Sequence, residues 1–324
     1  MPLLEVQDLD IAVASNGILH PVVRGVSFGI EENETLGIVG ESGCGKSLTA
    51  LAIMGLLDGG HVRLTGGSIR FDGRELITLG ARDRRAIMGD QMAMIFQEPM
   101  TSLNPVYRVG DQIVESLRRH RTLTRRQARD RAVALLDLVR IPDPARRIDS
   151  FPHQMSGGQR QRVMIAMALS CDPKLLIADE PTTALDVTVQ KEVLDLMTDL
   201  QARTGTAIIM ISHDLGVIAE TCDNVAVMYR GKIAEAAATA DLFAHMRHPY
   251  TCGLLNSIPA VDHDVEWLAA IPGRVPTIDE TLPGCAFHPR CADAEARCRI
   301  EDPHPRSMAP GHIVRCHLAD KGRP

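Results

Sequence analysis

The stretch that decides the fold is Gly40-Glu41-Ser42-Gly43-Cys44-Gly45-Lys46-Ser47. It fits the pattern G-x-x-x-x-G-K-[ST], in which backbone N–H groups and the N-terminus of the following helix hold phosphate oxygens. Apolar residues 36–39 precede it as a short buried strand, and residues 48–57 follow with leucines at helical spacing. A glycine-rich turn that matches by chance is the alternative, but the order of strand, loop and helix favours a nucleotide site.

Each residue type in this loop has a part in holding a nucleotide. Glycines let the backbone come close to the phosphates. Lys46 is expected to reach the β- and γ-phosphates as a point charge, and the Ser47 hydroxyl is expected to bind Mg²⁺. The residues that we expect to contact the nucleotide here are Gly40, Ser42, Gly43, Cys44, Gly45, Lys46, Ser47 and Leu48.

Polar side chains stand at the ends of three other apolar segments that read as buried strands: Gln97, Asp179 with Glu180, and His213. Phosphoryl transfer needs Mg²⁺ and a group that orients or deprotonates the attacking water. Asp179 is the expected Mg²⁺ partner of Ser47, and Glu180 is the expected base. Gln97 is expected to touch the metal or the water, and His213 the γ-phosphate.

These polar residues also have plainer interpretations. Asp179 and Glu180 can instead cap a strand-to-helix turn, although burying two carboxylates at the end of a sheet without a cation is costly. His213, taken alone, is an ordinary histidine at the end of a strand. The combination of all these groups with one phosphate loop favours the catalytic interpretation.

A second glycine-rich turn, Ser156-Gly157-Gly158-Gln159, also leads into a helix and is a second candidate phosphate contact. The order of the motifs along the chain resembles the ATPase subunits of ABC transporters: residues 40–47, Gln97, 156–159, 175–180, Asp186 and His213. The resemblance implies that Ser156, Gly158 and Gln159 close over the γ-phosphate held by a partner subunit, so that ATP is sandwiched between two subunits. It also places Asp186 among the nucleotide-binding residues.

The resemblance covers essentially the whole chain and narrows to the oligopeptide and dipeptide importer branch. It is carried by residues 96–105, 179–190 and 248–251, and by a tail similar to that branch's C-terminal extension. It implies an ATPase at the cytoplasmic face of the cell membrane that energises uptake of peptides, or of nickel or glutathione. The implied partners are a second, homologous ATPase subunit, two permease subunits that span the membrane, and an extracytoplasmic peptide-binding protein. When the two ATPase subunits close on ATP, we expect the movement to be transmitted to the permeases through the segment after Gln97 and the helical insert.

Three positions depart from the pattern of this family. Val13, with His20 as the nearest flat ring, stands where relatives usually place an aromatic residue that stacks on adenine. Met155 replaces the leucine that commonly precedes the second glycine-rich turn, which conserves volume. Cys252 occupies a position that is often arginine. Only the first departure bears on function, because it leaves the adenine contact unassigned.

We therefore expect an α/β fold: a P-loop NTPase core with a mostly parallel sheet, an antiparallel β subdomain and an inserted α-helical subdomain. Residues 3–31 and 67–73 read as antiparallel strands, and residues 109–148 show helical spacing. The predicted nucleotide-binding domain spans residues 1–250, with the helical subdomain at about 99–158. A loop-rich, cysteine-containing extension spans residues 251–324. It holds nine of the 19 prolines, which predicts loops rather than packed layers.

Composition and charge limit the classes of protein to which this chain can belong. The chain has 324 residues, 45% of them hydrophobic, which suits a globular protein, and its net charge of -6 argues against a general nucleic-acid binder. No apolar run is long enough for a membrane helix or a signal peptide. Arginines crowd residues 118–131, which favours a solvated helical face over contact with anionic lipid or a partner.

Four of the eight cysteines lie in the last forty residues: Cys285, Cys291, Cys298 and Cys316. Their spacing, C-x₅-C-x₆-C-x₁₇-C, is wider than the C-x₂-C pairs of structural zinc sites. Four thiolates without a consistent histidine suit an iron–sulfur cluster, and the resemblance implies one, so we predict a structural [4Fe-4S] cluster. Zinc and free thiols are the alternatives.

Other classes of ATPase fit less well. A soluble ABC-type ATPase that acts on ribosomes or nucleic acid predicts two cassettes in one chain or a long coiled-coil insert, and this sequence has neither. A GTPase or a P-loop kinase leaves residues 156–159 unexplained. A regulatory subunit without hydrolysis is disfavoured because Glu180 and the second glycine-rich turn are both intact.

Overall fold

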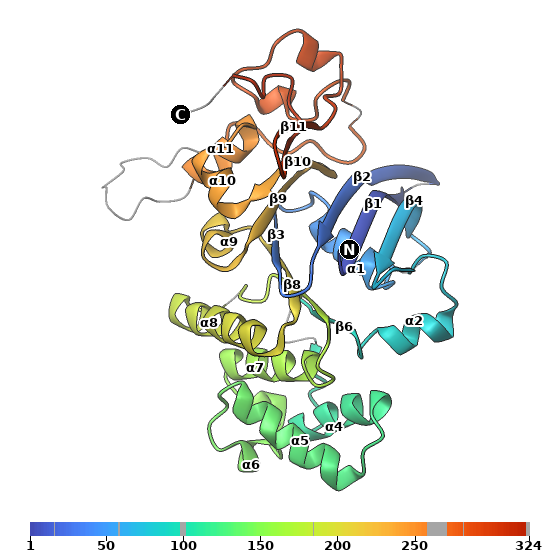
Figure 1. Ribbon diagram of the computed structural model, residues 1–324, viewed down its shortest axis with the longest axis vertical. Coiled ribbons are helices and arrows are strands. Elements are labelled where there is room, and N and C mark those ends of the chain that lie inside the picture. The colour runs from blue at the N-terminus through green and yellow to red at the C-terminus, as the bar shows by residue number, and fades with distance from the viewer. Residues whose placement is uncertain are drawn as a thin grey trace. The chain divides into compact units, whose positions relative to one another are not determined.

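The computed structural model describes residues 1–15, 17–57, 59–97, 102–183, 185–257, 271–280 and 282–321. The chain divides into two compact units: the first comprises Met1–Ile30, Thr35–Ile77 and Met210–Pro324, and the second comprises Glu31–Glu34 and Thr78–Ile209. Figure 1 shows their elements. The segment expected to carry closure begins with residues 98–101, which lie outside the described residues. The predicted domain boundary after residue 250 stays a prediction.

The first unit contains the predicted antiparallel sheet, with the strand order β2-β1-β4-β5. The strands are β1 (Leu4–Ser15), β2 (Ile18–Ile30), β4 (Val62–Phe71) and β5 (Arg74–Glu75). Shifts of register let β1 pair antiparallel with β2 and with β4 along most of its length. Asp72 and Gly73 have φ angles of 49° and 73°, which suit the tight hairpin between β4 and β5.

The phosphate loop follows a strand of a second sheet, whose order within the first unit is β11-β12-β10-β9-β3. β3 (Thr35–Val39) is buried throughout and pairs parallel with β9 (Asn224–Tyr229), which pairs antiparallel with β10 (Lys232–Ala238). Helix α1 (Lys46–Ile53) starts at the end of the loop, and α9 (Leu215–Thr221) packs on β3. The order of strand, loop and helix is therefore confirmed.

The C-terminal extension is more regular than its prolines predicted. Helices α10 (Thr239–Ala244) and α11 (Pro249–Asn256) lead into it, and it contains the short turns η2 (His288–Arg290) and η3 (Arg297–Arg299). Strand β12 (His312–Val314) pairs antiparallel with β10 and with β11 (Arg306–Ala309). Outside these short elements the described part of the extension consists of loops and turns, as predicted, and Pro305 and Pro310 flank β11 instead of interrupting it.

The second unit combines parallel strands with helices. β6 (Met92–Ile95) and β7 (Leu175–Asp179) pair parallel, and β8 (Ala207–Ser212) runs from this unit into the first. Helices α2 (Ala81–Ile87), α7 (Gly157–Ala168) and α8 (Val187–Thr204) belong to the same unit. The carboxyl ends of β6 and β7 lie at one edge, where ligands of open parallel sheets bind.

The predicted helical insert consists of α4 (Val109–His120), α5 (Arg125–Leu138), α6 (Pro144–Arg147) and the short turn η1 (Pro152–Gln154). Its helical spacing buries Ala128, Ala132, Leu135 and Leu136 on one face of α5. Thr124 caps α5, because its side chain accepts from the N–H of Gln127 while the Gln127 side chain accepts from the N–H of Thr124. The helical prediction for residues 109–148 is confirmed.

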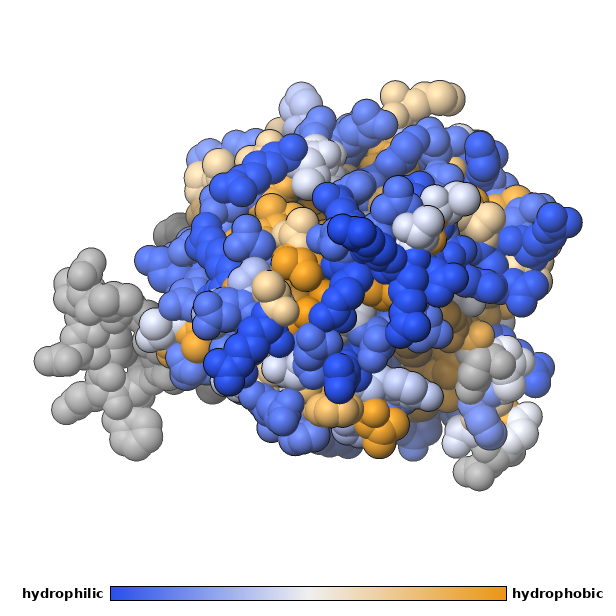
Figure 2. Space-filling model, turned by 90° about the horizontal axis from the view of Figure 1, so that it is seen from below, coloured by the Kyte–Doolittle hydropathy of each residue, from blue (hydrophilic) through white to orange (hydrophobic). Residues whose placement is uncertain are grey.

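Three arginines of the arginine-rich surface of the second unit pair with carboxylates of the same unit. Three pairs are Arg121–Asp90 at 3.0 Å, Arg129–Asp149 at 2.7 Å and Arg131–Asp172 at 2.9 Å. Figure 2 views the molecule from below Figure 1, where α4, α5 and α6 lie, and this face is mostly hydrophilic. The pairs agree with a solvated helical face. None of the helices in the described ranges has the length and apolar character that crossing a membrane requires.

Candidate nucleotide site

The phosphate loop of the first unit takes a shape that glycine makes possible at two positions. Gly40 has a φ of 154°, and a Cβ there would lie 2.2 Å from the carbonyl oxygen of Met228 in β9. Gly45 has a φ of 107°, and a Cβ there would lie 2.9 Å from Val23 Cγ2 in β2. Any larger residue would therefore push the loop away from these strands.

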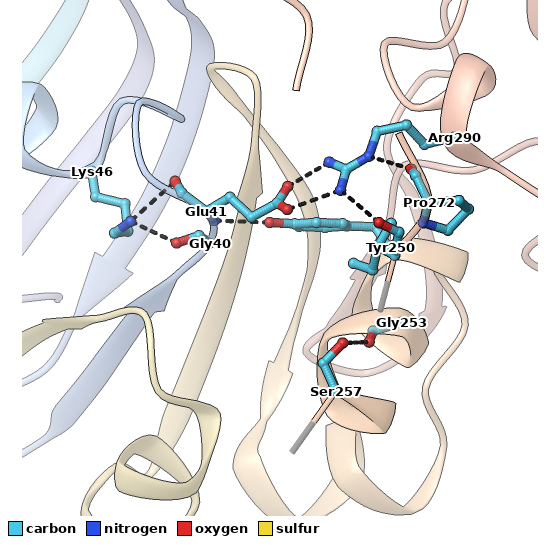
Figure 3. A network of polar contacts seen from close by, with 9 residues as sticks. Gly40, Glu41, Lys46, Tyr250, Gly253, Ser257, Pro272 and Arg290 are labelled. Carbon is cyan, nitrogen blue, oxygen red and sulfur yellow. Dashed lines mark hydrogen bonds and ion pairs between the residues drawn. The ribbon is translucent and has the colours of Figure 1, made fainter. Parts of the chain in front are cut away.

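Lys46 starts α1 and lies within the loop. Its Nζ donates to the carbonyl oxygens of Gly40 at 2.6 Å and Glu41 at 3.3 Å (Figure 3). The residue is only 5% exposed, so its charge is directed at the loop and not into solvent. A positive charge at this place is what the phosphates of a nucleotide require.

The other loop residues differ in exposure. Ser42 and Gly43 are exposed, whereas Ser47 and Leu48 are half-buried. Burial raises the pKa of the Cys44 thiol, so its side chain contributes packing instead of a negative charge. The exposed pair lies where a phosphate from solvent has access to the loop.

His213 is an exposed residue of the first unit that follows β8 directly. The next residue, Asp214, caps α9, because its carboxylate accepts from the N–H of Gly216 at 2.8 Å. His213 is thereby fixed between the end of a strand and the start of a helix, as the sequence predicted.

The predicted carboxylates stand at the end of β7 in the second unit. Asp179 is only 4% exposed. Glu180 follows with a φ of 47°, a conformation that is uncommon outside glycine and is often found at functional sites. Its Oε2 accepts hydrogen bonds from Gln97 Nε2 at 2.9 Å and from Thr183 Oγ1 at 2.8 Å. The structure thus brings Gln97 and Glu180 together and adds Thr183, which sequence analysis missed.

The second glycine-rich turn begins α7. Ser156 caps this helix, because its Oγ accepts from the N–H of Gln159 at 3.3 Å and Gln159 Oε1 accepts from the N–H of Ser156 at 3.2 Å. A Cβ on Gly158 would lie 2.6 Å from Val189 Cγ1, so α7 approaches α8 closely here. Asp186 caps α8 by accepting from the N–H of Val189 at 3.0 Å. Both predicted nucleotide-binding residues, Ser156 and Asp186, therefore lie at helix N-termini.

Comparison with known proteins identifies the family. Residues 23–183 match the ABC transporter family model, and residues 234–298 match the C-terminal region of oligopeptide/dipeptide transporters. The chain is 48% identical to the oligopeptide transport ATP-binding protein AppD of Bacillus subtilis, covering 98% of this chain and 97% of AppD. It is 45% identical to the dipeptide transport ATP-binding protein DppD of Escherichia coli, covering 100% of this chain and 99% of DppD. The chain belongs to the ABC transporter ATP-binding proteins.

Further relatives and solved structures agree with this ABC ATPase assignment. A putative peptide import ATP-binding protein of Brucella abortus is 50% identical, covering 97% of this chain and 94% of that protein. The cassette cbiO1 from Clostridium perfringens, part of the ABC transporter complex cbiONQ, has a TM-score of 0.63 and 26% identity, over 75% of this chain and 91% of that one. The dimeric cassette MJ0796 bound to ADP and Pi has a TM-score of 0.66 and 24% identity, over 73% of this chain and 98% of that one, and shows the fold alone. The predicted family, ATPase class and P-loop fold are confirmed.

The predicted iron–sulfur site of the ABC ATPase is not supported. Among the described residues, which include all four clustered cysteines, no group of three or more histidine, cysteine, aspartate or glutamate side chains is arranged to hold a metal ion. Burial, together with the thiols of the other three cysteines, raises the pKa of Cys285 to about 11. Cys316 packs in a small core with Val314, Leu318 and Ala319.

The adenine contact stays unassigned. Val13 of β1 lies directly opposite His20 of β2 in the antiparallel pairing, so the two side chains that the sequence singled out are neighbours. His20 is the flat ring at this point of the sheet, in the first unit with the phosphate loop.

Sequence analysis also missed two residues that reach the phosphate loop from the C-terminal part of the ABC ATPase. The N–H of Glu41 donates to Tyr250 Oη at 2.9 Å. The Glu41 carboxylate accepts from Arg290 Nη1 at 2.6 Å and from Nη2 at 2.9 Å (Figure 3). Local patterns carry no signal for these contacts, because they join positions 209 and 249 residues apart.

Proposed function

We propose that this ABC ATPase binds Mg·ATP and that ATP hydrolysis energises the import of oligopeptides or dipeptides across the cell membrane. The observation that carries the chemistry is Glu180 at the end of a buried strand, held by hydrogen bonds from Gln97 and Thr183. The cargo class is supported by the match of residues 234–298 and by the names of the relatives.

The proposed roles follow from the chemistry of each group. Lys46 and the backbone of residues 40–47 hold the phosphates, and Ser47, Gln97 and Asp179 hold Mg²⁺. Glu180 orients and deprotonates the attacking water. Two neutral donors fix its carboxylate in one orientation, which a base needs in order to face its water. His213 contacts the γ-phosphate as a hydrogen-bond donor.

We propose that hydrolysis takes place between two ATPase subunits, this chain and a homologous partner. Ser156, Gly158 and Gln159 would contact the nucleotide held by the partner. What supports this is that Ser156 lies at the N-terminus of the 12-residue helix α7, where backbone N–H groups and the helix dipole favour an anion. Asp186, at the N-terminus of α8, is the remaining residue that we propose to contact a nucleotide.

The proposed assembly places this subunit at the cytoplasmic face of the membrane, against two permeases that receive peptide from an extracytoplasmic binding protein. The segment after Gln97 and helices α4–α6 would transmit the closing movement of the two ATPase subunits to the permeases. Residues 1–250 would form the nucleotide-binding domain, and residues 251–324 the extension. The match of residues 234–298 to the C-terminal region of peptide transporters supports the presence of this extension.

An iron–sulfur cluster is proposed from the sequence alone, and no step of hydrolysis depends on it. Cys285, Cys291, Cys298 and Cys316 are the donors that such a cluster needs. Iron and sulfide analysis after anaerobic purification tests this proposal. A colourless protein without iron after anaerobic reconstitution would remove it.

A pull-down from native membranes with the full chain as bait tests the function. We expect two permease subunits and a second ATPase to co-purify, and peptide with its binding protein to stimulate ATP hydrolysis by the assembly. Recovery of ribosomal or nucleic-acid partners without permeases would overturn the importer proposal.

A further inference from the structure

Glu41, the second residue of the phosphate loop, is held by side chains from the C-terminal end of the chain. Arg290 donates two parallel hydrogen bonds to its carboxylate, at 2.6 Å and 2.9 Å. The Arg290 side chain is only 4% exposed, and that of Glu41 is 29% exposed. A bidentate pair with one partner almost fully buried fixes the direction of the carboxylate as well as its position.

Arg290 is itself fixed by residues of the extension and by Tyr229 of β9. Its Nε donates to the carbonyl oxygen of Pro272 at 3.0 Å. Its guanidinium carbon lies 5.9 Å from the ring centre of Tyr229 and 6.0 Å from that of Phe287. The ion pair with Glu41 therefore joins the phosphate loop to a packed part of the extension and not to a mobile surface side chain.

Tyr250 holds the backbone of the same loop residue. Its hydroxyl oxygen accepts the N–H of Glu41 at 2.9 Å. Tyr250 is fully buried, and its ring centre lies 4.6 Å from that of Tyr229. The carbonyl oxygens of Gly40 and Glu41 in turn accept from Lys46 Nζ (Figure 3). Glu41 thus contacts Arg290 and Tyr250 on one side and Lys46 on the other, so one residue links them to the lysine of the phosphate loop.

We propose that Arg290 of the C-terminal extension and Tyr250 of α11, the helix that leads into it, are positioning residues that hold the phosphate loop ready for ATP and ADP. The inference rests on the proposed function only in that the loop binds these nucleotides. Because the contacts are made to the loop and not to the catalytic Glu180, they act on nucleotide affinity and leave the chemical step unchanged. A contact that only packs the extension would affect folding without affecting affinity.

Four single variants of the full chain test this proposal. Tyr250→Phe removes only the hydroxyl that accepts the Glu41 N–H, and Arg290→Lys keeps the charge but loses the bidentate geometry. We expect each to weaken ATP and ADP binding about 3–10-fold, because a loop that has lost one of its hydrogen bonds must be ordered when the nucleotide binds, at a cost up to that of the bond. Glu41→Gln should act in the same direction. Arg297→Met is the matched control, because Arg297 pairs with Glu301 on the exposed surface of the extension.

The measurements are the Kd values of Mg·ATP and Mg·ADP by calorimetry, and KM and kcat of the ATPase. We expect KM to rise with kcat within about twofold. The double variant Glu41→Gln/Arg290→Lys should lose no more affinity than the weaker-binding single variant, because both changes break one pair. Thermal unfolding without nucleotide records any change in stability separately.

Affinities within twofold of wild type in both Tyr250→Phe and Arg290→Lys would overturn the inference. So would additive losses in the double variant, or an equal loss in Arg297→Met. A wild-type chain that binds neither nucleotide would overturn the proposed function instead, which keeps the two failures distinct.

Discussion

Glu180 combines three features at one residue. Its backbone has a φ of 47°, its side chain accepts two hydrogen bonds, and it follows a strand that is buried throughout. A left-handed conformation costs a residue with a side chain on the order of 1 kcal/mol, so the surrounding structure must hold the residue in place. At Glu180 this conformation and the two hydrogen bonds together fix the direction of the carboxylate.

The first prediction concerns this carboxylate. Glu180→Gln keeps the size of the side chain and removes the base, so we expect ATP hydrolysis to fall about 10²–10⁴-fold. The Kd of Mg·ATP should stay within about twofold, because the phosphates are held by the loop. Single-turnover hydrolysis and calorimetry measure the two effects. Glu192→Gln changes an exposed carboxylate of the same unit and should leave both unchanged, and normal turnover in Glu180→Gln would dismiss the base assignment.

The second prediction concerns Cys222, whose pKa is raised from 9.0 to about 12 by burial. Between these pH values the unfolded chain releases a proton that the folded chain retains, so the free energy of unfolding falls as the pH rises. We expect Cys222 to contribute a loss of about 1.4 kcal/mol for each pH unit above 9. Urea unfolding at pH 8, 9.5 and 10.5 under reducing conditions measures it against Cys222→Ala. Parallel curves for the two proteins would contradict the prediction.

At the scale of the elements, sequence analysis succeeded where a structure is set by neighbouring residues. The phosphate loop, β7 with its terminal carboxylates, and helices α4 and α5 follow from period and local pattern, and all are present. It failed where a distant segment decides the outcome. Strand β12 forms by pairing with the edge of β10, and no local sequence pattern in the extension predicts that pairing. Arg290 and Tyr250 were missed for the same reason.

The third prediction concerns the packing of α9 on β3. Gly37 faces this helix so closely that a Cβ would lie 2.5 Å from Ile218 Cγ2 and 3.3 Å from Cys222 Sγ. Overpacking of this kind costs about 1–3 kcal/mol, so we expect Gly37→Ala to lower the free energy of unfolding by that amount. Urea unfolding gives the value.

A second substitution, at Ile218, tests whether crowding by this side chain causes the cost of Gly37→Ala. Ile218→Ala makes room for the new methyl group, so the double variant Gly37→Ala/Ile218→Ala should lose less than the sum of the single variants. Gly29→Ala is the matched control, because a Cβ at this strand glycine would meet its neighbours at 3.5 Å or more. A cost at Gly29 equal to that at Gly37 would contradict the explanation.

At the scale of the whole molecule, the residues predicted to act on the nucleotide are divided between the two compact units. The phosphate loop and His213 belong to the first unit, and Gln97, Asp179, Glu180 and Ser156 belong to the second. The proposed partner subunit adds one further requirement. In the proposed pair, residues 156–159 of one chain would contact the nucleotide held by the other chain. A change there is then expected to leave nucleotide binding by the same chain intact and to lower hydrolysis by the pair.

The last prediction uses this separation. Ser156→Ala removes the hydroxyl that caps α7 and, in the proposed pair, a donor to the partner's nucleotide. We expect the Mg·ATP affinity of the altered chain alone to stay within about twofold, and hydrolysis at the partner's phosphate loop in the assembled pair to fall about 10²-fold. Thr124→Ala is the matched control, because Thr124 caps α5 with the same reciprocal pair of hydrogen bonds. Each variant should lose about 1 kcal/mol of stability from the cap. Since the two caps are alike, an equal loss of hydrolysis in both variants would assign the effect to the helix cap, and a loss confined to Ser156→Ala assigns it to the nucleotide of the partner.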